Sequence, residues 1–199
     1  FTKATGQASH AEGVATTASG NFSHAEGQGT IAGTGHTSQF PGVGYISGSH
    51  AEGVRTVAIG GGSHAEGVET TATTFTYYGN VFGGSHAEGF RTTASGGYSH
   101  AEGHSTTASG YHSHAEGTET LASSYVSHAE GWRTEASGYS SHAEGSDTTA
   151  SGYPSHAEGY NTTASGNGSH AEGRETTASG QGSHAEGSRT ISTGSGSHA

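Results

Sequence analysis

Ser99-His100-Ala101-Glu102-Gly103 and Thr106-Thr107-Ala108-Ser109-Gly110 form one complete repeat of this chain. The first motif occurs thirteen times, the last copy ending at Ala199, and from His86 onward its step is always fourteen residues. The second motif varies more and lies between copies of the first. A unit this short cannot enclose a pair of helices, but it suits one coil of a solenoid that buries its interior by stacking on its neighbours.

Alternation along a strand gives each motif an inner and an outer face. Residues two apart share a face, so Ser99, Ala101 and Gly103 lie opposite His100 and Glu102. In the second motif the first Thr, Ala and Gly share a face in the same way. These small residues suit the interior of a thin roll, and each half-repeat is predicted to contain a five-residue strand and a Gly corner.

The composition excludes several classes of protein. Apolar residues make up 28% of the 199 residues, and 37 residues are Gly, which alone would suggest disorder, but the strict period argues against it. The absence of Cys excludes disulfides, and a net charge of −11 with six Lys and Arg argues against nucleic-acid binding. No apolar run is long enough to insert into a membrane.

The predicted fold class is therefore all-β, a parallel β-roll or β-solenoid of 14-residue coils with two short strands in each coil. We expect residues 1–199 to form a single continuous solenoid of about fourteen coils. The chain begins and stops within the repeat pattern, so we expect it to be a fragment of a longer protein.

The outer pair of the first motif varies nowhere among the complete copies, whereas the other outward positions vary freely. This invariance suggests that the surface formed by His and Glu packs against the same surface of another chain. We name the repeated pair the His–Glu ladder. Its members are His10, Glu12, His24, Glu26, His50, Glu52, His64, Glu66, His86, Glu88, His100, Glu102, His114, Glu116, His128, Glu130, His142, Glu144, His156, Glu158, His170, Glu172, His184 and Glu186.

The paired seven-residue pattern resembles the head repeats of trimeric autotransporter adhesins, and Thr56-Val57-Ala58-Ile59-Gly60 is close to a strand typical of that family. The Ser-His-Ala-Glu-Gly form also resembles repeat shafts of phage tail and neck-appendage proteins. The first resemblance implies a left-handed roll that packs as a homotrimer. Both imply an extracellular, cell-surface or virion location.

Three chemical interpretations of the His–Glu ladder stay open. In the first, Glu accepts a hydrogen bond from His in a structural network. In the second, imidazoles bind a metal ion such as Zn, Cu or Ni, which would make assembly metal-dependent. The third, acid–base catalysis, conflicts with thirteen copies, because a catalytic site is normally unique. We favour the structural network, with no catalytic residue, no metal and no cofactor.

Two insertions interrupt the period near residues 35–48 and 75–84, both after the second motif. Insertions into a solenoid map to loops that often bind ligands. The aromatic residues that we predict to bind a ligand here are Phe40, Tyr45, Phe75, Tyr77, Tyr78 and Phe82. Alternatively, the two loops fold over a neighbouring subunit.

The predicted function is a structural shaft or head segment of an attachment fibre, not an enzyme. Its partners would be copies of itself and a cell-surface glycan or receptor. The alternatives are a carbohydrate- or receptor-binding module that uses the two aromatic loops, and a metal-dependent assembly through the His–Glu ladder.

Overall fold

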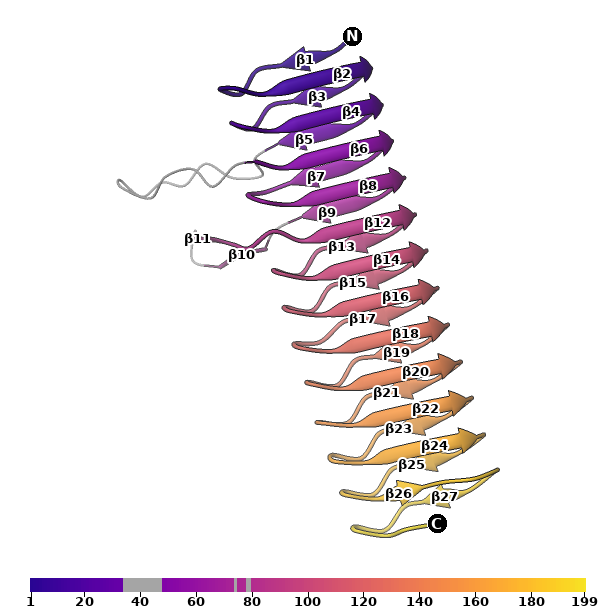
Figure 1. Ribbon diagram of the computed structural model, residues 1–199. Coiled ribbons are helices and arrows are strands. Elements are labelled where there is room, and N and C mark those ends of the chain that lie inside the picture. Colours follow the sequence, from indigo (N-terminus) through magenta and orange to yellow (C-terminus); the bar gives the residue numbers. More distant parts are fainter. Residues whose placement is uncertain (34–47, 74, 78–79) are drawn as a thin grey trace. The chain divides into compact units, whose positions relative to one another are not determined.

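The computed structural model describes residues 1–33, 48–73, 75–77 and 80–199, and the chain divides into two compact units, Phe1–His104 and Ser105–Ala199. Each unit is built from coils that contain one long and one short strand. Within each unit the long strands stack into one parallel sheet and the short strands into another (Figure 1). The prediction of a parallel β-solenoid is confirmed, while left-handed coiling and one continuous domain stay predictions.

In the first unit the long strands, in sheet order, are β2 (His10–Val14), β4 (His24–Gln28), β6 (His50–Val54), β8 (His64–Val68), β12 (His86–Phe90) and β14 (His100–His104). The short strands are β1 (Lys3–Ala4), β3 (Thr17–Ala18), β5 (Ile31–Gly33), β7 (Val57–Ile59), β9 (Thr71–Thr73) and β13 (Thr93–Ala94).

In the second unit the long strands are β16 (His114–Thr118), β18 (His128–Trp132), β20 (His142–Ser146), β22 (His156–Tyr160), β24 (His170–Arg174) and β26 (His184–Ala185). The short strands are β15 (Thr107–Ala108), β17 (Leu121–Ala122), β19 (Glu135–Ala136), β21 (Thr149–Ala150), β23 (Thr163–Ala164), β25 (Thr177–Ala178) and β27 (Ile191–Ser192).

The register places each residue against its counterpart in the next coil. In the second unit, for example, His156 pairs with His170. The backbone amide of His156 donates to the carbonyl of Ser169 at 3.0 Å, a pattern that recurs from coil to coil. Identical side chains therefore form rows along each unit.

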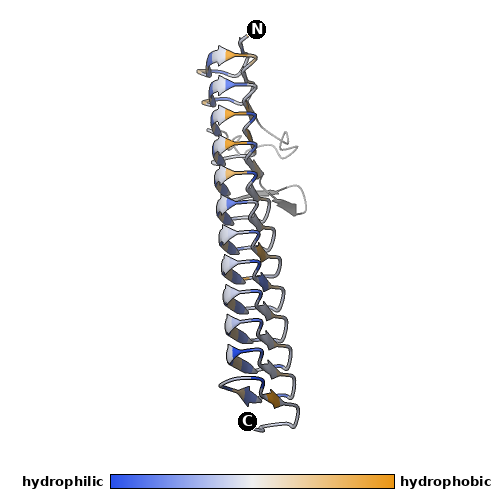
Figure 2. Cartoon of the chain, turned by 90° about the vertical axis from the view of Figure 1, so that its right-hand side faces the viewer, coloured by the Kyte–Doolittle hydropathy of each residue, from blue (hydrophilic) through white to orange (hydrophobic). Residues whose placement is uncertain are grey.

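The interior consists of small residues, as predicted. Ala129 and Thr134 are at most 1% exposed, and the same motif positions are buried along both units. Ser141 is also buried, and its hydroxyl donates to the carbonyl of Gly138 at 2.7 Å, closing the corner before the long strand. Figure 2 accordingly shows mostly neutral or hydrophilic colours in the coils.

The glycine of the first motif does not complete the inner face, which corrects the predicted strand boundaries. Gly145 has a φ of +106°, and a Cβ there would overlap the carbonyl oxygen of Gly159. The long strand also begins at His rather than at Ser. This glycine is required by backbone conformation and by the close approach of the next coil.

The second strand is shorter than the five residues predicted. β19 covers only Glu135–Ala136. Beyond it, the amides of Ser137 and Gly138 share one acceptor, the carbonyl of Ala150, at 3.0 and 3.2 Å. Because two successive donors share one acceptor, the regular ladder ends there.

Both insertions leave the register of the sheets unchanged. His24 pairs with His50 across the first insertion, and His64 pairs with His86 across the second. Within the second, β10 (Phe75–Tyr77) and β11 (Asn80–Phe82) pair as an antiparallel hairpin. Among the described residues there is no helix of the length and apolarity needed to cross a membrane.

Candidate functional site

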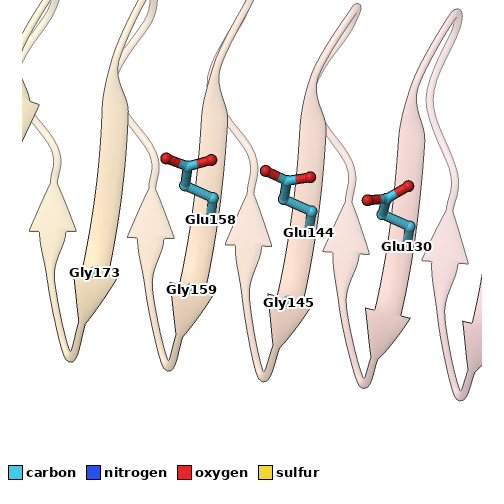
Figure 3. Close-up of a pocket in the computed structure, with 6 residues that line it drawn as sticks. All are labelled: Glu130, Glu144, Gly145, Glu158, Gly159 and Gly173. Atoms are coloured by element: carbon cyan, nitrogen blue, oxygen red, sulfur yellow. The ribbon is translucent and has the colours of Figure 1, made fainter.

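The long strands carry the His–Glu ladder on their outer face. His and Glu alternate with the buried Ala, so the fold presents the same two side chains at every coil. Figure 3 shows Glu130, Glu144 and Glu158 projecting in a row from successive long strands. Together with Gly145, Gly159 and Gly173 they line a shallow groove.

The imidazoles stack along each unit. In the second unit the ring centroids of His156 and His170 lie 4.7 Å apart with an interplanar angle of 3°. In the first unit the rings of His24 and His50 lie 4.8 Å apart at 7°. The spacing of the rings is thus the spacing of the strands themselves.

The pairing of His with Glu differs between the described parts of the two units. In the first unit each described pair lies within one coil, as in His50 Nε2 to Glu52 Oε2 at 3.8 Å. In the second unit His156 Nε2 lies 3.7 Å from Glu144 Oε1 and 3.9 Å from Glu158 Oε2. His170 repeats this arrangement with Glu158 and Glu172, at 3.8 and 3.9 Å. Glu144, Glu158 and Glu172 thus approach imidazoles of two coils, whereas Glu130 lies near His128 of its own coil at 3.6 Å.

These separations exceed the length of a hydrogen bond, which is about 2.7–3.2 Å for a nitrogen donor. The Nε2 atoms in question are nevertheless shielded from solvent and have no hydrogen-bond partner among the described residues. They belong to His24, His50, His64, His86, His128, His142, His156, His170 and His184. Such atoms are costly unless a further group satisfies them.

Burial and mutual repulsion affect the ionisation of the ladder. Burial lowers the pKa of His50, His128, His156 and His170 from its ordinary value, and charge on the neighbouring imidazoles lowers it further. These histidines therefore favour the neutral form. Burial raises the pKa of Glu130, but hydrogen bonds with Glu144 and Glu116, together with the charges of His128 and His142, leave that pKa below its ordinary value.

A second row of side chains, at the corner after each long strand, was not foreseen. Glu69 accepts hydrogen bonds from Arg55 at 2.9 Å and Arg91 at 2.8 Å. In the second unit Arg133 lies 3.8 Å from Glu119 and 3.5 Å from Asp147. At this corner the sign of the charge alternates from one repeat to the next, as in Glu119, Arg133 and Asp147. This alternation could have predicted the ion pairs from the sequence.

The predicted ligand-binding residues are only partly within the described structure. Phe40, Tyr45 and Tyr78 lie outside the described residues. In the hairpin, Phe75 pairs with Phe82, and Tyr77 pairs with Asn80. At another corner, in the second unit, the rings of Tyr125 and Tyr139 stack with their centroids 5.1 Å apart.

The repeats match a known family along most of the chain. The model of the YadA head domain repeat matches residues 11–32, 51–73, 87–113, 101–122, 136–153, 143–169 and 171–197. The chain belongs to the YadA head domain repeat family. No curated protein matches its sequence. Membership confirms the predicted resemblance and, with the β-solenoid, indicates a structural adhesin-type head segment.

Proposed function

We propose that this chain is a structural head or shaft segment of an attachment fibre on a cell surface or a virion. In this proposal it works as a homotrimer in which the His–Glu ladder of each chain lies at the subunit interface. The YadA head repeats support an adhesin-type role. The observation that supports this interface is that Nε2 atoms of the ladder, such as that of His156, are hidden from solvent and have no hydrogen-bond partner among the described residues.

One chain has a weak interior. Its largest fully buried side chains are threonines such as Thr106, and its buried apolar side chains are all alanines among the described residues. Apolar burial contributes only about 25 cal/mol per Å², so a core of Ala stabilises a roll poorly. Packing against further chains would supply the burial that one chain lacks.

The His–Glu ladder has the properties of a surface that packs against another. In His156 and Glu158 the side chains are still 36% and 33% exposed, yet the Nε2 atom of His156 is already hidden from water. Solvent therefore does not satisfy this nitrogen in a single chain, and we expect packing against a second chain to turn the ring and provide a partner. The same state recurs along both units, which fits a continuous interface.

Cysteine cross-linking tests this arrangement, because the native chain has no Cys. Glu88→Cys places a single thiol on the ladder face of β12. Thr93→Cys is the matched control, since Thr93 lies in β13 of the same coil and faces outward from the other sheet. We expect mild oxidation to link Glu88→Cys chains in pairs and to leave Thr93→Cys chains unlinked.

Preferential linking of Thr93→Cys would place the interface on the short-strand sheet and overturn the proposed interface. Absence of linking in both variants, at a concentration where the wild-type chain is oligomeric, would also overturn it. Each chain carries one thiol, so a trimer should give a linked pair and one free chain on a denaturing gel.

A second candidate function is recognition of a saccharide or receptor by the hairpin of β10 and β11. The hairpin extends from a corner that otherwise holds a short turn, and its register sets Phe75 opposite Phe82. Aromatic rings provide a large contact area for a sugar face. Glycan-array binding before and after removal of the hairpin tests this function.

A further inference from the structure

We propose that the His–Glu ladder of the second unit binds divalent transition-metal ions of the Zn²⁺ type between neighbouring coils. The groups are His128, Glu130 and His142; His156, Glu158 and His170; His170, Glu172 and His184; and His184, Glu186 and His198. Within each group, one ligand atom from each residue lies within 4.8 Å of the others. The site needs residues of one chain only and does not depend on the trimer.

The distances suit a shared ion better than a direct contact. In the second group Glu158 Oε2 lies 3.9 Å from His156 Nε2, and Glu158 Oε1 lies 3.8 Å from His170 Nε2. These gaps are too long for hydrogen bonds and shorter than the separation of about 4.5 Å between two partners of one bridging water, which makes hydrogen bonds of about 2.8 Å at a tetrahedral angle. Two ligands of one zinc ion, at bonds of about 2.0–2.2 Å, lie at most about 4.3 Å apart.

The second imidazole must move to join the same ion. The rings of His156 and His170 stack at 4.7 Å between centroids, and the ligand atoms of the group lie within 4.8 Å of one another, whereas two ligands of a tetrahedral zinc ion lie about 3.5 Å apart. Both side chains are about one-third exposed, at 36% and 35%, so the rings have room to tilt toward each other. Metal binding should therefore change the stacking of the rings.

The orphaned nitrogens are a second and independent observation. Nε2 of His128, His156, His170 and His184 is buried and has no hydrogen-bond partner among the described residues. The same atoms face carboxylate oxygens. An unprotonated imidazole nitrogen with a nearby carboxylate is a typical donor pair for zinc, and coordination would satisfy both groups.

The donor set selects the class of ion. Imidazole with carboxylate suits Zn²⁺, Ni²⁺ and Cu²⁺, whereas Mg²⁺ and Ca²⁺ prefer oxygen ligands throughout. Two of the four groups share His170 and two share His184, so at most three can be filled together. Filling alternate pairs of coils also keeps the charges of neighbouring ions apart.

The first unit offers a matched control within the same chain. His50 and His64 stack at 4.7 Å and pair with their own glutamates at 3.8 Å. Among the described residues of that unit, however, no group of three ligand atoms meets the same separation. In three of the four groups the local difference is a carboxylate beside the imidazole of the next coil, as in Glu158 beside His170.

The experiment uses the whole chain after removal of metal with a chelator. Zn²⁺ is titrated calorimetrically, Co²⁺ serves as a visible-absorption probe of coordination, and Mg²⁺ is the negative probe. We compare the wild-type chain with His156→Gln/His170→Gln and with the control His50→Gln/His64→Gln. Mass in solution is recorded in chelator and in Zn²⁺, so that loss of metal binding and loss of assembly are read separately.

We expect up to three zinc ions per wild-type chain, fewer in His156→Gln/His170→Gln, and no change in the control. The Co²⁺ spectrum should indicate nitrogen and oxygen ligands. Equal loss of ions in both double variants, binding of Mg²⁺ as tight as that of Zn²⁺, or no binding of Zn²⁺ to the folded wild-type chain would each overturn the proposal.

Discussion

Nε2 of His156 lies closer to Oε1 of Glu144, in the preceding coil, than to Oε2 of Glu158 in its own coil, at 3.7 against 3.9 Å. The second unit therefore couples adjacent coils through its outer surface as well as through its backbone. The coupling arises because the parallel register stacks identical side chains at the strand spacing.

The interior of the roll should not tolerate charge. Ala129 is 0% exposed, so Ala129→Asp would bury a carboxylate without a partner, and we expect a loss of about 3–5 kcal/mol in the free energy of unfolding. The control Ser123→Asp is at an exposed position in the same unit and should change it by less than about 0.5 kcal/mol. Urea denaturation of both variants measures the difference, and similar losses would contradict the assignment of faces.

The motif glycine should be required for packing as well as for conformation. Gly145 and Gly182 both have positive φ, at +106° and +62°, but only a Cβ on Gly145 would meet the next coil. Gly182→Ala should cost about 1–2 kcal/mol from backbone strain alone. Gly145→Ala should cost about 1–3 kcal/mol more through overpacking. Thermal unfolding compares the two, and equal costs would show that close approach is unimportant.

Acid should destabilise the chain through its neutral histidines. The pKa of His50 is lowered from 6.5 by burial, then by His64 and His24, while Glu52 and Glu26 oppose the shift. The unfolded state therefore takes up protons first as pH falls below about 6.5, and stability decreases from that point until pH has fallen below the pKa of the folded state. Above about pH 6.5 the imidazole is neutral in both states, and the shift does not affect stability. His128, His156 and His170 shift in the same direction and add to the effect.

The measurement is the urea midpoint in chelator between about pH 8 and pH 5, above the range in which most carboxylates titrate. An NMR titration of His50 should give a pKa below 6.5. A midpoint that rises in acid, or a pKa of His50 above its ordinary value, would contradict the prediction.

The second insertion should be dispensable for folding. Thr71 pairs with Thr93 and His64 with His86 directly across it, so replacing residues 74–83 by a two-residue corner keeps both sheets in register. We expect unchanged circular dichroism and a melting temperature within about 2–4 °C of the wild-type value, the shift produced by about 1 kcal/mol in a chain of this length. Loss of the trimer in this variant would show that the hairpin links subunits; loss of glycan binding alone would support its role in recognition.

Much of the fold can be predicted from the sequence because successive side chains of a strand point to opposite faces. Ala129 and Ser141 lie inside and His156 and Glu158 outside, as their positions in the motif predict. The short second strand does not follow, because it depends on Ser137 and Gly138 sharing one carbonyl.

The candidate site was less predictable. The approach of His156 to Glu144 depends on side-chain rotamers and on the offset between coils, neither of which is visible in the sequence. The corner pairs could have been found, since Glu119, Arg133 and Asp147 occur one repeat apart with alternating sign. The aromatic insertions are plain in the sequence, but their ligand depends on three-dimensional shape.

The mass of the chain in solution tests the central claim most directly. Light scattering coupled to gel filtration, in chelator at neutral pH, should give three times the chain mass of 19.7 kDa. We expect a trimer because the interior of one chain buries little apolar surface and because the His–Glu ladder is proposed to pack against partner chains. A folded species at 19.7 kDa that persists as concentration is raised would contradict the account.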